Sequence, residues 1–249
     1  MMDLSDYFSR NRKVAVAFSG GVDSAYLLYA AKHSGADVTA YFVKTQFQPA
    51  FELADARRFS EEYDIPLTVI ELDALADQTV RSNPPDRCYY CKRRVFSAIM
   101  AAARQDGYTL LLDGTNASDD AADRPGMRAL AELSVNSPLR DCGLTKARIR
   151  ELSKEAGLFT WDKPSYACLA TRIKTGEPLT AEKLARTERT EDFLFTLGFS
   201  DFRVRSRNDT AVLQLRTEQF ELWLANRRTI TQRLKREYGE VLLDTEGRE

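Results

Sequence analysis

A short apolar run that leads directly into a glycine-rich turn constrains this chain more than any other feature. Val14-Ala-Val-Ala-Phe18 is followed without a break by Ser19-Gly20-Gly21-Val22-Asp23-Ser24 and then by a second apolar stretch. The pattern predicts a buried strand, a tight turn and a helix, in that order. Gly20 and Gly21 permit the turn and a close approach of the backbone to a ligand. Because the first N–H groups of a helix lack intrahelical partners, the turn directs several donors at one point and favours an anion site.

The side chains of this turn suit a phosphate ligand. The hydroxyls of Ser19 and Ser24 can donate to phosphate oxygens, and Asp23 is placed to hold a Mg²⁺ that bridges phosphates. The sequence contains no Gly-Lys dipeptide and no G-x-G-x-x-G string, which excludes the Walker loop and the dinucleotide fingerprint. A glycine-rich turn without a ligand is the alternative, but the match of the whole string in a strand-turn-helix context favours a phosphate loop of another kind.

Apolar strand-like runs alternate with amphipathic stretches through the first half of the chain. The predicted strands cover residues 14–18, 38–43, 67–72 and 109–112. The predicted helices cover residues 24–34, 50–63 and 92–105. Gly35, Pro66 and Gly107 follow these helices, as chain-breaking residues commonly do. The βαβα order predicts an α/β fold with a doubly wound, mainly parallel sheet covered by helices.

The regular alternation ends after Asp113, where a long polar loop begins. A helix is predicted over residues 145–156, and the stretch 159–178, which lacks periodicity, is interpreted as a functional loop joined to an interdomain link. Beyond it, two helices and three short strands predict a small α+β unit. The 249 residues therefore divide into a nucleotide domain, residues 1–170, and a small substrate-binding or oligomerisation domain, residues 171–249.

The charge balance of the chain bears on whether it binds nucleic acid or a membrane. Thirty-six Lys and Arg residues against 37 Asp and Glu residues give a net charge of −1, so no global field attracts nucleic acid or an anionic membrane. No signal peptide and no apolar run of membrane-spanning length is present, and the cytoplasm is the expected location. The single histidine, His33, is expected at a helix end facing solvent, which argues against histidine-based metal sites.

Cys88 and Cys91 form a C-x-x-C pair at the start of a predicted helix. This spacing lets two thiolates face one iron or zinc centre. A closed zinc site would need two further ligands, and the sequence offers no second C-x-x-C. Two ordinary thiols near a helix start are the alternative.

Cys168 lies inside the loop without periodicity, between Lys163 and Arg172. Neighbouring positive charge and loop exposure both favour the thiolate, so a nucleophile or a metal ligand is predicted. Together with Cys88 and Cys91, Cys168 is sufficient to bind three irons of a [4Fe–4S] cluster, whose fourth iron is then open to an exogenous sulfide. Cys142 is interpreted as a buried structural thiol, although it is also an alternative third ligand in place of Cys168.

With these strings established, two resemblances emerge. The loop Ser19 to Ser24 resembles the pyrophosphate loop (PP-loop) of the N-type ATP pyrophosphatases, which cleave ATP between its α and β phosphates. Nearly the whole chain resembles the LarE family of sulfur transferases, which insert sulfur into pyridinium-3,5-biscarboxylic acid mononucleotide on the way to the nickel-pincer nucleotide cofactor. The matching stretches are residues 19–24, 83–92, 112–114, Asp123-Arg124-Pro125-Gly126, 161–172 and 202–205.

The resemblance implies a mechanism and two possible sources of sulfur. ATP adenylates a substrate carboxylate with release of pyrophosphate, a sulfur nucleophile displaces AMP, and a thiocarboxylate results. In one branch of the family the cysteine at the position of Cys168 gives up its own sulfur and becomes dehydroalanine. In the other branch three cysteines hold a [4Fe–4S] cluster. The presence of Cys88, Cys91 and Cys168 favours the cluster branch.

The resemblance also assigns functional residues and an assembly. It implies ATP and Mg²⁺ as further cofactors, a pyridinium mononucleotide as the small-molecule substrate, and a homohexamer; the sulfide donor is not identified. Glu191 matches an acidic position near the family's substrate or metal region, but Gln214 stands where an acid is expected. Asp113 and Gly114, at the carboxyl end of a strand, suit the nucleotide crevice of an open α/β sheet. The residues assigned to ATP or substrate phosphates are Ser19, Gly20, Gly21, Asp23, Ser24, Arg203 and Arg205, and those assigned to catalysis are Cys168 and Asp23.

Three other functions compete with this assignment. A tRNA thiolation enzyme shares adenylation by the same loop and can use a three-cysteine cluster, but the net charge and the lone C-x-x-C argue against nucleic acid as the partner. A substrate-adenylating amidotransferase leaves the three cysteines unexplained. A non-catalytic ATP sensor or iron–sulfur protein does not require Asp23 beside the glycines. Arg203 and Arg205 have an alternative interpretation too, as the outward face of a strand.

Overall fold

The computed structural model describes residues 3–119 and 125–248, which form two compact units. The first unit comprises Met1–Ala74 and Asp86–Lys163, and the second comprises Leu75–Pro85 and Pro164–Glu249. The short segment joins the second unit because Leu179 donates its N–H to the Arg81 carbonyl and the Asn83 side chain donates to the carbonyls of Lys174 and Glu177. The boundary expected at residues 170 and 171 stays a prediction.

The first unit is built on a parallel sheet of four strands in the order β3-β2-β1-β4. This arrangement confirms the predicted α/β class. Backbone bonds from Asn136 N–H to Leu111 and from Asp113 N–H to Asn136 continue the sheet beyond β4. The strands are β1 (Lys13–Ala17), β2 (Asp37–Lys44), β3 (Leu67–Glu71) and β4 (Leu111–Leu112).

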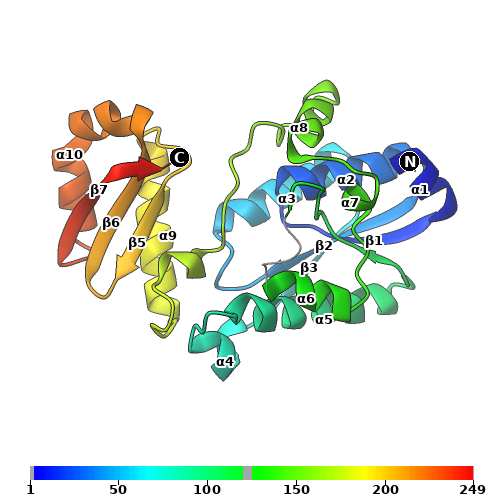
Figure 1. Ribbon diagram of the computed structural model, residues 1–249, viewed down its shortest axis with the longest axis horizontal. Helices are drawn as coiled ribbons and strands as arrows, with labels where there is room; N and C mark the ends of the chain where they lie inside the picture. The colour runs from blue at the N-terminus through cyan, green and yellow to red at the C-terminus, as the bar shows by residue number, and fades with distance from the viewer. Residues whose placement is uncertain (1–2, 120–124, 249) are drawn as a thin grey trace. The chain divides into compact units, whose positions relative to one another are not determined.

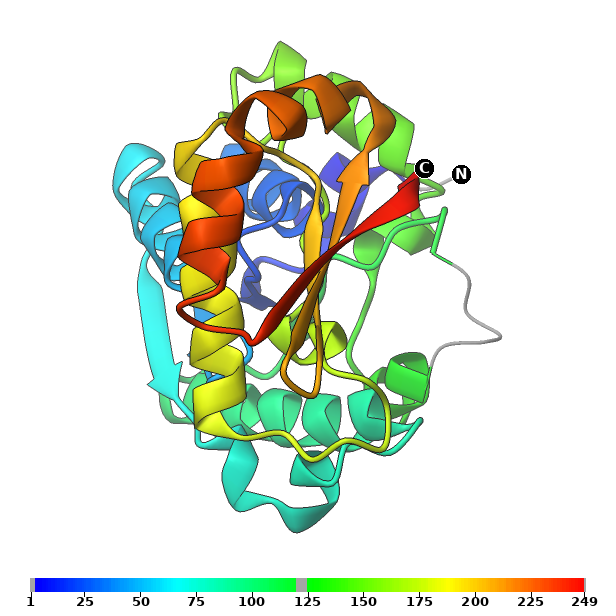
Figure 2. The same cartoon turned by 90° about the vertical axis from the view of Figure 1, so that its left-hand side faces the viewer.

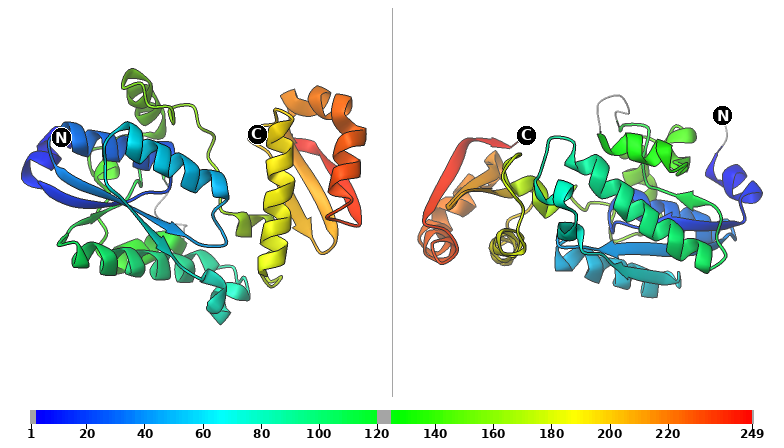
Figure 3. Two further views of the ribbon diagram at one scale, coloured as in Figure 1. Left: turned by 180° about the vertical axis from the view of Figure 1, so that it is seen from behind. Right: turned by 90° about the horizontal axis from the view of Figure 1, so that it is seen from below.

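Helices cover both faces of this sheet (Figures 1 and 3). Successive residues of a strand point to opposite faces, and β1 shows this directly. Val14 and Val16 pack with α1, α2, α3 and α8, whereas Ala15 packs with α5 and α6. The helices are α1 (Leu4–Arg10), α2 (Val22–His33), α3 (Ala50–Glu62), α5 (Arg87–Gln105), α6 (Pro125–Glu132), α7 (Pro138–Asp141) and α8 (Lys146–Glu155).

Helices α5 and α1 of the first unit differ from the sequence-based expectation. Helix α5 begins at Arg87 rather than near residue 92, so Cys88 and Cys91 lie within its first turns. Pro85 and Asp86 immediately precede it, and such residues commonly stand at helix starts. Helix α1 was not predicted, although Asp3 caps it and Leu4, Tyr7 and Phe8 form its buried face.

The second unit packs two long helices on one face of a three-stranded sheet (Figures 2 and 3). The strand order is β5-β6-β7, with β5 and β6 antiparallel and β6 and β7 parallel. Val204, Leu213 and Leu243 face the helices and form the core with Leu194 and Leu234. The elements are α4 (Gln78–Arg81), η2 (Leu169–Arg172), α9 (Ala181–Thr196), β5 (Arg203–Arg207), β6 (Thr210–Arg216), η3 (Thr217–Gln219), α10 (Phe220–Leu234) and β7 (Glu240–Arg248), and η1 (Ala74–Ala76) begins at the last residue of the first unit's opening segment.

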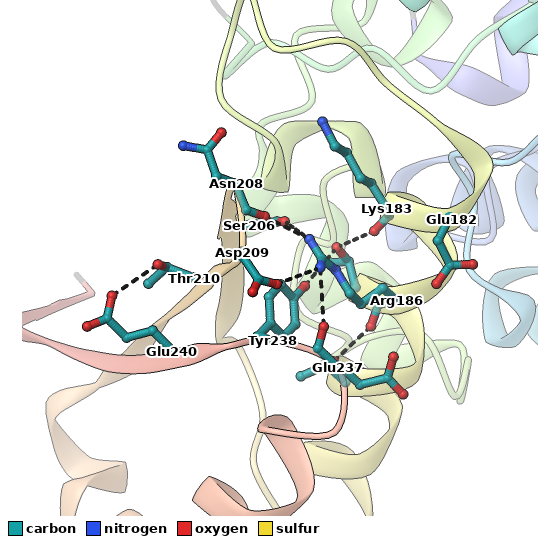
Figure 4. A network of polar contacts seen from close by, with 12 residues as sticks. Glu182, Lys183, Arg186, Ser206, Asn208, Asp209, Thr210, Glu237, Tyr238 and Glu240 are labelled. Carbon is teal, nitrogen blue, oxygen red and sulfur yellow. Dashed lines mark hydrogen bonds and ion pairs between the residues drawn. The ribbon is translucent and has the colours of Figure 1, made fainter.

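A polar network around Arg186 holds one end of this unit together (Figure 4). Arg186 lies on α9 and donates to the Asn208 carbonyl, the Asp209 carboxylate and the Glu237 carbonyl. Its guanidinium also lies 4.1 Å from the centre of the Tyr238 ring. One arginine thereby joins α9 to the β5–β6 turn and to the start of β7.

Within residues 3–119 and 125–248, the structure contains no helix with the length and apolar character needed to cross a lipid bilayer.

Candidate functional site

The predicted phosphate loop lies between β1 and α2, at the carboxyl end of the strand. Gly20 has a φ of +74°, a conformation that favours glycine, and a Cβ there would make a tight contact of 3.1 Å with the Glu52 carbonyl oxygen. Gly21 is the N-cap of α2, and no described side chain caps the helix at that position. The first N–H groups of a helix lack intrahelical partners, so an anion is the expected ligand here, and its binding stays a prediction.

The two serines of the loop contact each other. Their hydroxyl oxygens are 3.1 Å apart, and the Ser19 N–H donates to Ser24 Oγ at 3.3 Å. The Ser24 hydroxyl also donates to the Gly21 carbonyl. These bonds close the loop on itself and keep both hydroxyls beside the helix N-terminus.

Gly114 brings the end of β4 against this loop. A Cβ on Gly114 would lie 2.9 Å from the backbone nitrogen of Ser24, a distance that only glycine permits. The neighbouring Asp113 carboxylate is buried and accepts hydrogen bonds from Thr115 Oγ1 at 2.5 Å and Ser137 Oγ at 2.6 Å. Asp113 therefore organises the loop after β4, and its predicted contact with the nucleotide stays a prediction.

Two lysines flank the loop, and sequence reasoning did not assign either of them to it. Lys146 Nζ lies 2.5 Å from Asp23 Oδ2, while Asn116 donates to Asp23 Oδ1 at 3.4 Å. Lys163, which is close to Cys168 in sequence, donates to the Gly20 carbonyl at 3.0 Å and to Asp55 Oδ2 at 2.6 Å. The positive charge of Lys163 is thus directed at the loop and Asp55.

Cys88 and Cys91 lie one helical turn apart on α5. Residues three apart share one face of a helix, and the two thiols are exposed and half-buried respectively, so the pair fits two ligands of one centre. The buried Arg87 guanidinium donates to Cys88 Sγ at 3.6 Å. In the part of the chain that the structure describes, no group of three His, Cys, Asp or Glu residues is arranged to hold a metal.

Cys168 belongs to the second unit and directly precedes η2. Its carbonyl accepts from the Thr171 N–H at 2.9 Å, and its side chain is half-buried. Arg172, at the end of the same turn, is buried and donates to the Ala167 carbonyl at 2.7 Å. The arginine therefore binds the residue that precedes the cysteine.

Glu191 is the partner of Arg172 inside the second unit. Its carboxylate accepts from Arg172, from the Tyr166 hydroxyl and from the Val204 N–H. These bonds occupy the carboxylate that the sequence matched to a substrate or metal position. Its observed role is to join α9 to η2 and β5.

Arg203 and Arg205 lie on the face of the sheet opposite the two helices. Arg205 donates to the Thr171 carbonyl at 2.5 Å and to Gln214 Oε1 at 2.8 Å. Burial first, and then the charges of Arg203, Arg172 and Arg248, lower the pKa of Arg205. A lowered arginine pKa beside other cations indicates concentrated positive charge, which a phosphate can neutralise.

The structure thus brings together two groups of the predicted residues, one in each unit. Residues 19–24 and Gly114 meet in the first unit, and Arg205 contacts the turn that follows Cys168 in the second. Cys142 is buried in the core of the first unit, as expected of a structural thiol. Asp123 and Arg124, part of a matching stretch, lie outside the described residues.

A parallel sheet whose first strand leads through Ser-Gly-Gly-Val-Asp-Ser to a helix N-terminus defines a nucleotide-binding domain of the PP-loop class. Comparison with known proteins agrees, because residues 12–122 match the family described as the tRNA methyl transferase HUP domain. The chain is 34% identical to the pyridinium-3,5-bisthiocarboxylic acid mononucleotide synthase of Lactiplantibacillus plantarum, over 82% of this chain and 75% of that protein. It belongs to the LarE family.

Two other relatives match this chain over different shares of their length. An uncharacterized protein of Synechocystis is 33% identical over 88% of this chain and 82% of its own length. A tRNA-specific 2-thiouridylase of Clostridium botulinum is 28% identical over 60% of this chain and 52% of its own length. The similarity to the thiouridylase therefore spans about half of that enzyme.

Proposed function

We propose that this protein is an ATP-dependent sulfur transferase that converts a carboxylate of pyridinium-3,5-biscarboxylic acid mononucleotide into a thiocarboxylate. The observation that carries the proposal is the similarity to the Lactiplantibacillus plantarum synthase over most of both chains. The loop at the end of β1 supports the use of ATP, and the arginines of β5 support a phosphorylated substrate.

The first chemical step is adenylation. A carboxylate oxygen of the substrate attacks the α-phosphorus of ATP, the bond between that phosphorus and the bridging oxygen to the β-phosphorus breaks, and pyrophosphate leaves with the electron pair. The loop Ser19 to Ser24 binds the phosphates through backbone N–H groups and hydroxyls, and Asp23 is the proposed ligand of Mg²⁺.

The second step is the transfer of sulfur. A sulfur nucleophile attacks the acyl carbon of the adenylate, the bond from that carbon to the phosphate oxygen breaks, and AMP leaves. Arg203 and Arg205 are proposed to hold the phosphate of the substrate during both steps, since a guanidinium offers paired donors to phosphate oxygens.

The proposed source of sulfur is sulfide carried on a [4Fe–4S] cluster with Cys88, Cys91 and Cys168 as ligands. Such a cluster leaves one iron without a protein ligand, and that iron supplies a binding position for sulfide. Support comes from the presence of all three cysteines and from the placement of Cys88 and Cys91 on one face of α5. Sacrifice of the Cys168 sulfur is the alternative.

The experiment that tests the function is product analysis with purified protein, MgATP, sulfide and the pyridinium mononucleotide. The expected result is release of AMP and pyrophosphate that depends on the pyridinium compound, with a thiocarboxylate product detected by mass spectrometry. Release that is independent of the compound, or no thiocarboxylate, contradicts the proposal.

The source of sulfur has its own test, which is anaerobic iron and acid-labile sulfide analysis. We expect cluster in the wild type and loss of cluster in Cys88→Ala, Cys91→Ala and Cys168→Ala. Cys142→Ala is the matched control and retains the cluster. If the wild type forms no cluster, loss of sulfur from Cys168 after turnover, measured by mass spectrometry, supports the sacrificial route.

A tRNA thiolation enzyme is the second candidate. It is favoured by the similarity to the Clostridium botulinum thiouridylase and by the exposed Arg227, Arg228 and Arg236 at α10 and just beyond it. Pyrophosphate release that depends on tRNA, and not on the pyridinium compound, would identify it. The hexamer and the cytoplasmic location stay predictions, and native mass spectrometry tests the former.

A further inference from the structure

Asn83 is a buried polar residue near the end of the short segment that belongs to the second unit. It is 2% exposed and has a φ of +56°, a left-handed conformation that asparagine adopts more readily than most residues. Its N–H donates to the Val80 carbonyl at 3.2 Å, directly after α4. Because a buried amide group is costly unless it is hydrogen-bonded, the partners of Asn83 indicate its role.

These partners lie in a single turn, residues 174–177. The Asn83 Nδ2 group donates to the Lys174 carbonyl at 2.9 Å and to the Glu177 carbonyl at 3.2 Å. The Asn83 carbonyl accepts from the Gly176 N–H at 2.8 Å. A side-chain amide has two N–H donors, and both are used here. One residue thereby holds the turn through its side chain and its backbone.

The turn is also fixed to the rest of the second unit. Ile173, directly before it, forms a parallel bridge with Ser206 in β5. Lys183 of α9 donates to Glu177 Oε1 at 2.6 Å. The turn therefore has a defined place in the unit that carries Cys168.

The two chain segments joined by Asn83 both lead to cysteines. Cys88 follows Asn83 by five residues, and Cys168 precedes Lys174 by six. Cys88 and Cys91 belong to the first unit, whereas Cys168 belongs to the second. Five residues of chain span at most about 18 Å, so fixing Asn83 restricts the positions that Cys88 can take.

We propose that Asn83 is a positioning residue for the transfer of sulfur. Its bonds to the turn 174–177 keep the thiols of Cys88 and Cys91 within reach of the Cys168 thiol, so that one cluster takes ligands from both units. The inference rests on the proposed cluster and adds to it a residue that restricts the separation of the ligands. Asn83 acts through the cysteines, by raising the effective concentration of one thiol at the other.

The test is cross-linking of cluster-free protein with a short bismaleimide, followed by peptide mass spectrometry, on the wild type and on Asn83→Gly. Glycine adopts the left-handed conformation and keeps the backbone bond to Gly176, but it removes both side-chain bonds. We expect the yield of the Cys88–Cys168 cross-link to fall about three- to tenfold, because the effective concentration of the thiols falls as the tether loosens. The Cys88–Cys91 cross-link joins two residues of one helix, so its yield stays unchanged and is the internal reference.

Asn208→Gly is the matched control. Asn208 also has a left-handed φ, of +54°, and lies in the same unit, in the turn between β5 and β6. The same substitution there keeps the bond from Arg186 to the Asn208 carbonyl. We expect the wild-type yield of both cross-links in this variant, together with wild-type iron content after anaerobic reconstitution. Asn83→Gly should retain less iron than Asn208→Gly.

Lys183→Met covers the case in which Asn83→Gly does not fold. The Lys183 side chain is 26% exposed, and its loss releases the Glu177 carboxylate from α9 without opening the core. We expect it to lower the yield of the Cys88–Cys168 cross-link and to leave the Cys88–Cys91 reference unchanged. An unchanged yield in this variant then overturns the inference.

Two further outcomes also contradict the inference. One is an equal yield of the Cys88–Cys168 cross-link in folded Asn83→Gly and in the wild type, and the other is the absence of this cross-link from the wild type. A wild type whose cross-link depends on Asn83 but which makes no thiocarboxylate contradicts the proposed function instead. The two failures are therefore distinguishable.

Discussion

Arg172 and Glu191 form a bidentate ion pair inside the second unit, with an Nε–Oε1 distance of 2.8 Å and an Nη2–Oε2 distance of 3.0 Å. Each side chain is only 1% exposed. Arg172 also donates to the Ala167 carbonyl, and Glu191 also accepts a hydrogen bond from the Val204 N–H. The pair therefore connects the segment that carries Cys168 to the sheet that carries Arg203 and Arg205.

The first prediction concerns the stability that this pair provides. Glu191→Gln leaves the buried Arg172 charge without a counter-charge and should lower the free energy of unfolding by about 3–5 kcal/mol. Urea denaturation followed by the fluorescence of Trp223 in a Trp161→Phe background reports on the second unit, because Trp223 packs against its core.

Glu182→Gln is the control for this experiment. Glu182 pairs with Arg189 on the surface, where the two side chains are 76% and 44% exposed, so its loss should cost no more than about 1 kcal/mol. Equal effects of the two substitutions would show that burial of the Arg172–Glu191 pair does not determine its contribution.

The second prediction is that Gly20 and Gly21 of the phosphate loop have different roles, one in stability and the other in ATP binding. Gly20→Ala places a side chain at a φ of +74° and 3.1 Å from the Glu52 carbonyl, so it should destabilise the first unit by about 1–2 kcal/mol. Gly21→Ala meets only Ser19 Oγ at 3.4 Å, an ordinary contact, and should fold normally. It should nevertheless weaken ATP binding, because the methyl group stands where the phosphate approaches the backbone.

Thermal unfolding and calorimetry with MgATP distinguish these effects. We expect a lower Tm for Gly20→Ala, and an unchanged Tm with weaker binding for Gly21→Ala. A Gly21→Ala variant that binds MgATP as the wild type does would show that the ligand does not approach the loop at this residue.

Local patterns in the sequence were sufficient for most of the fold. The apolar run at residues 14–18, the alternation of strands and helices up to residue 112, and the helix that begins after Thr145 all depend on residues that lie close together in the chain. The start of α5 was misplaced because the segment that includes Cys88 is polar and aromatic rather than periodically apolar.

The contacts of the candidate site were less predictable because they join distant residues. Asp23 and Lys146 are 123 positions apart, and no local pattern connects them. One weak signal was present, namely a lysine at the first helical position after Thr145, where a cation is unfavourable. The pairing of Glu191 with Arg172 could not be predicted either, because a sequence does not distinguish a glutamate that binds a metal from one that binds an arginine.

The third prediction concerns the order of thiol reactivity. Burial first, and then the charges of Asp141, Asp3 and Asp6, raise the pKa of the Cys142 thiol. A buried thiol with a raised pKa supplies little accessible thiolate, so Cys142 should react with iodoacetamide at least about tenfold more slowly than the exposed Cys88. Peptide mass spectrometry over a time course on cluster-free protein measures both rates. Equal rates would show that Cys142 is accessible in solution and would contradict its interpretation as a buried structural thiol.

The fourth prediction concerns acid stability and the carboxylate of Glu237. A hydrogen bond from Arg189 is the main cause that holds the pKa of Glu237 below its ordinary value of 4.5, with a further contribution from Arg233. A carboxylate whose pKa is lower in the folded than in the unfolded state stabilises the fold above its unfolded pKa and loses this contribution as the pH falls through the folded pKa. Glu237→Gln should therefore reduce the free energy of unfolding at neutral pH, and the difference from the wild type should shrink as the pH falls below 4.5.

Urea denaturation in steps from neutral to acid pH measures this difference, with Glu221→Gln as a control for the number of carboxyl groups. A difference that stays constant across this range would mean that Glu237 contributes through packing and not through its charge.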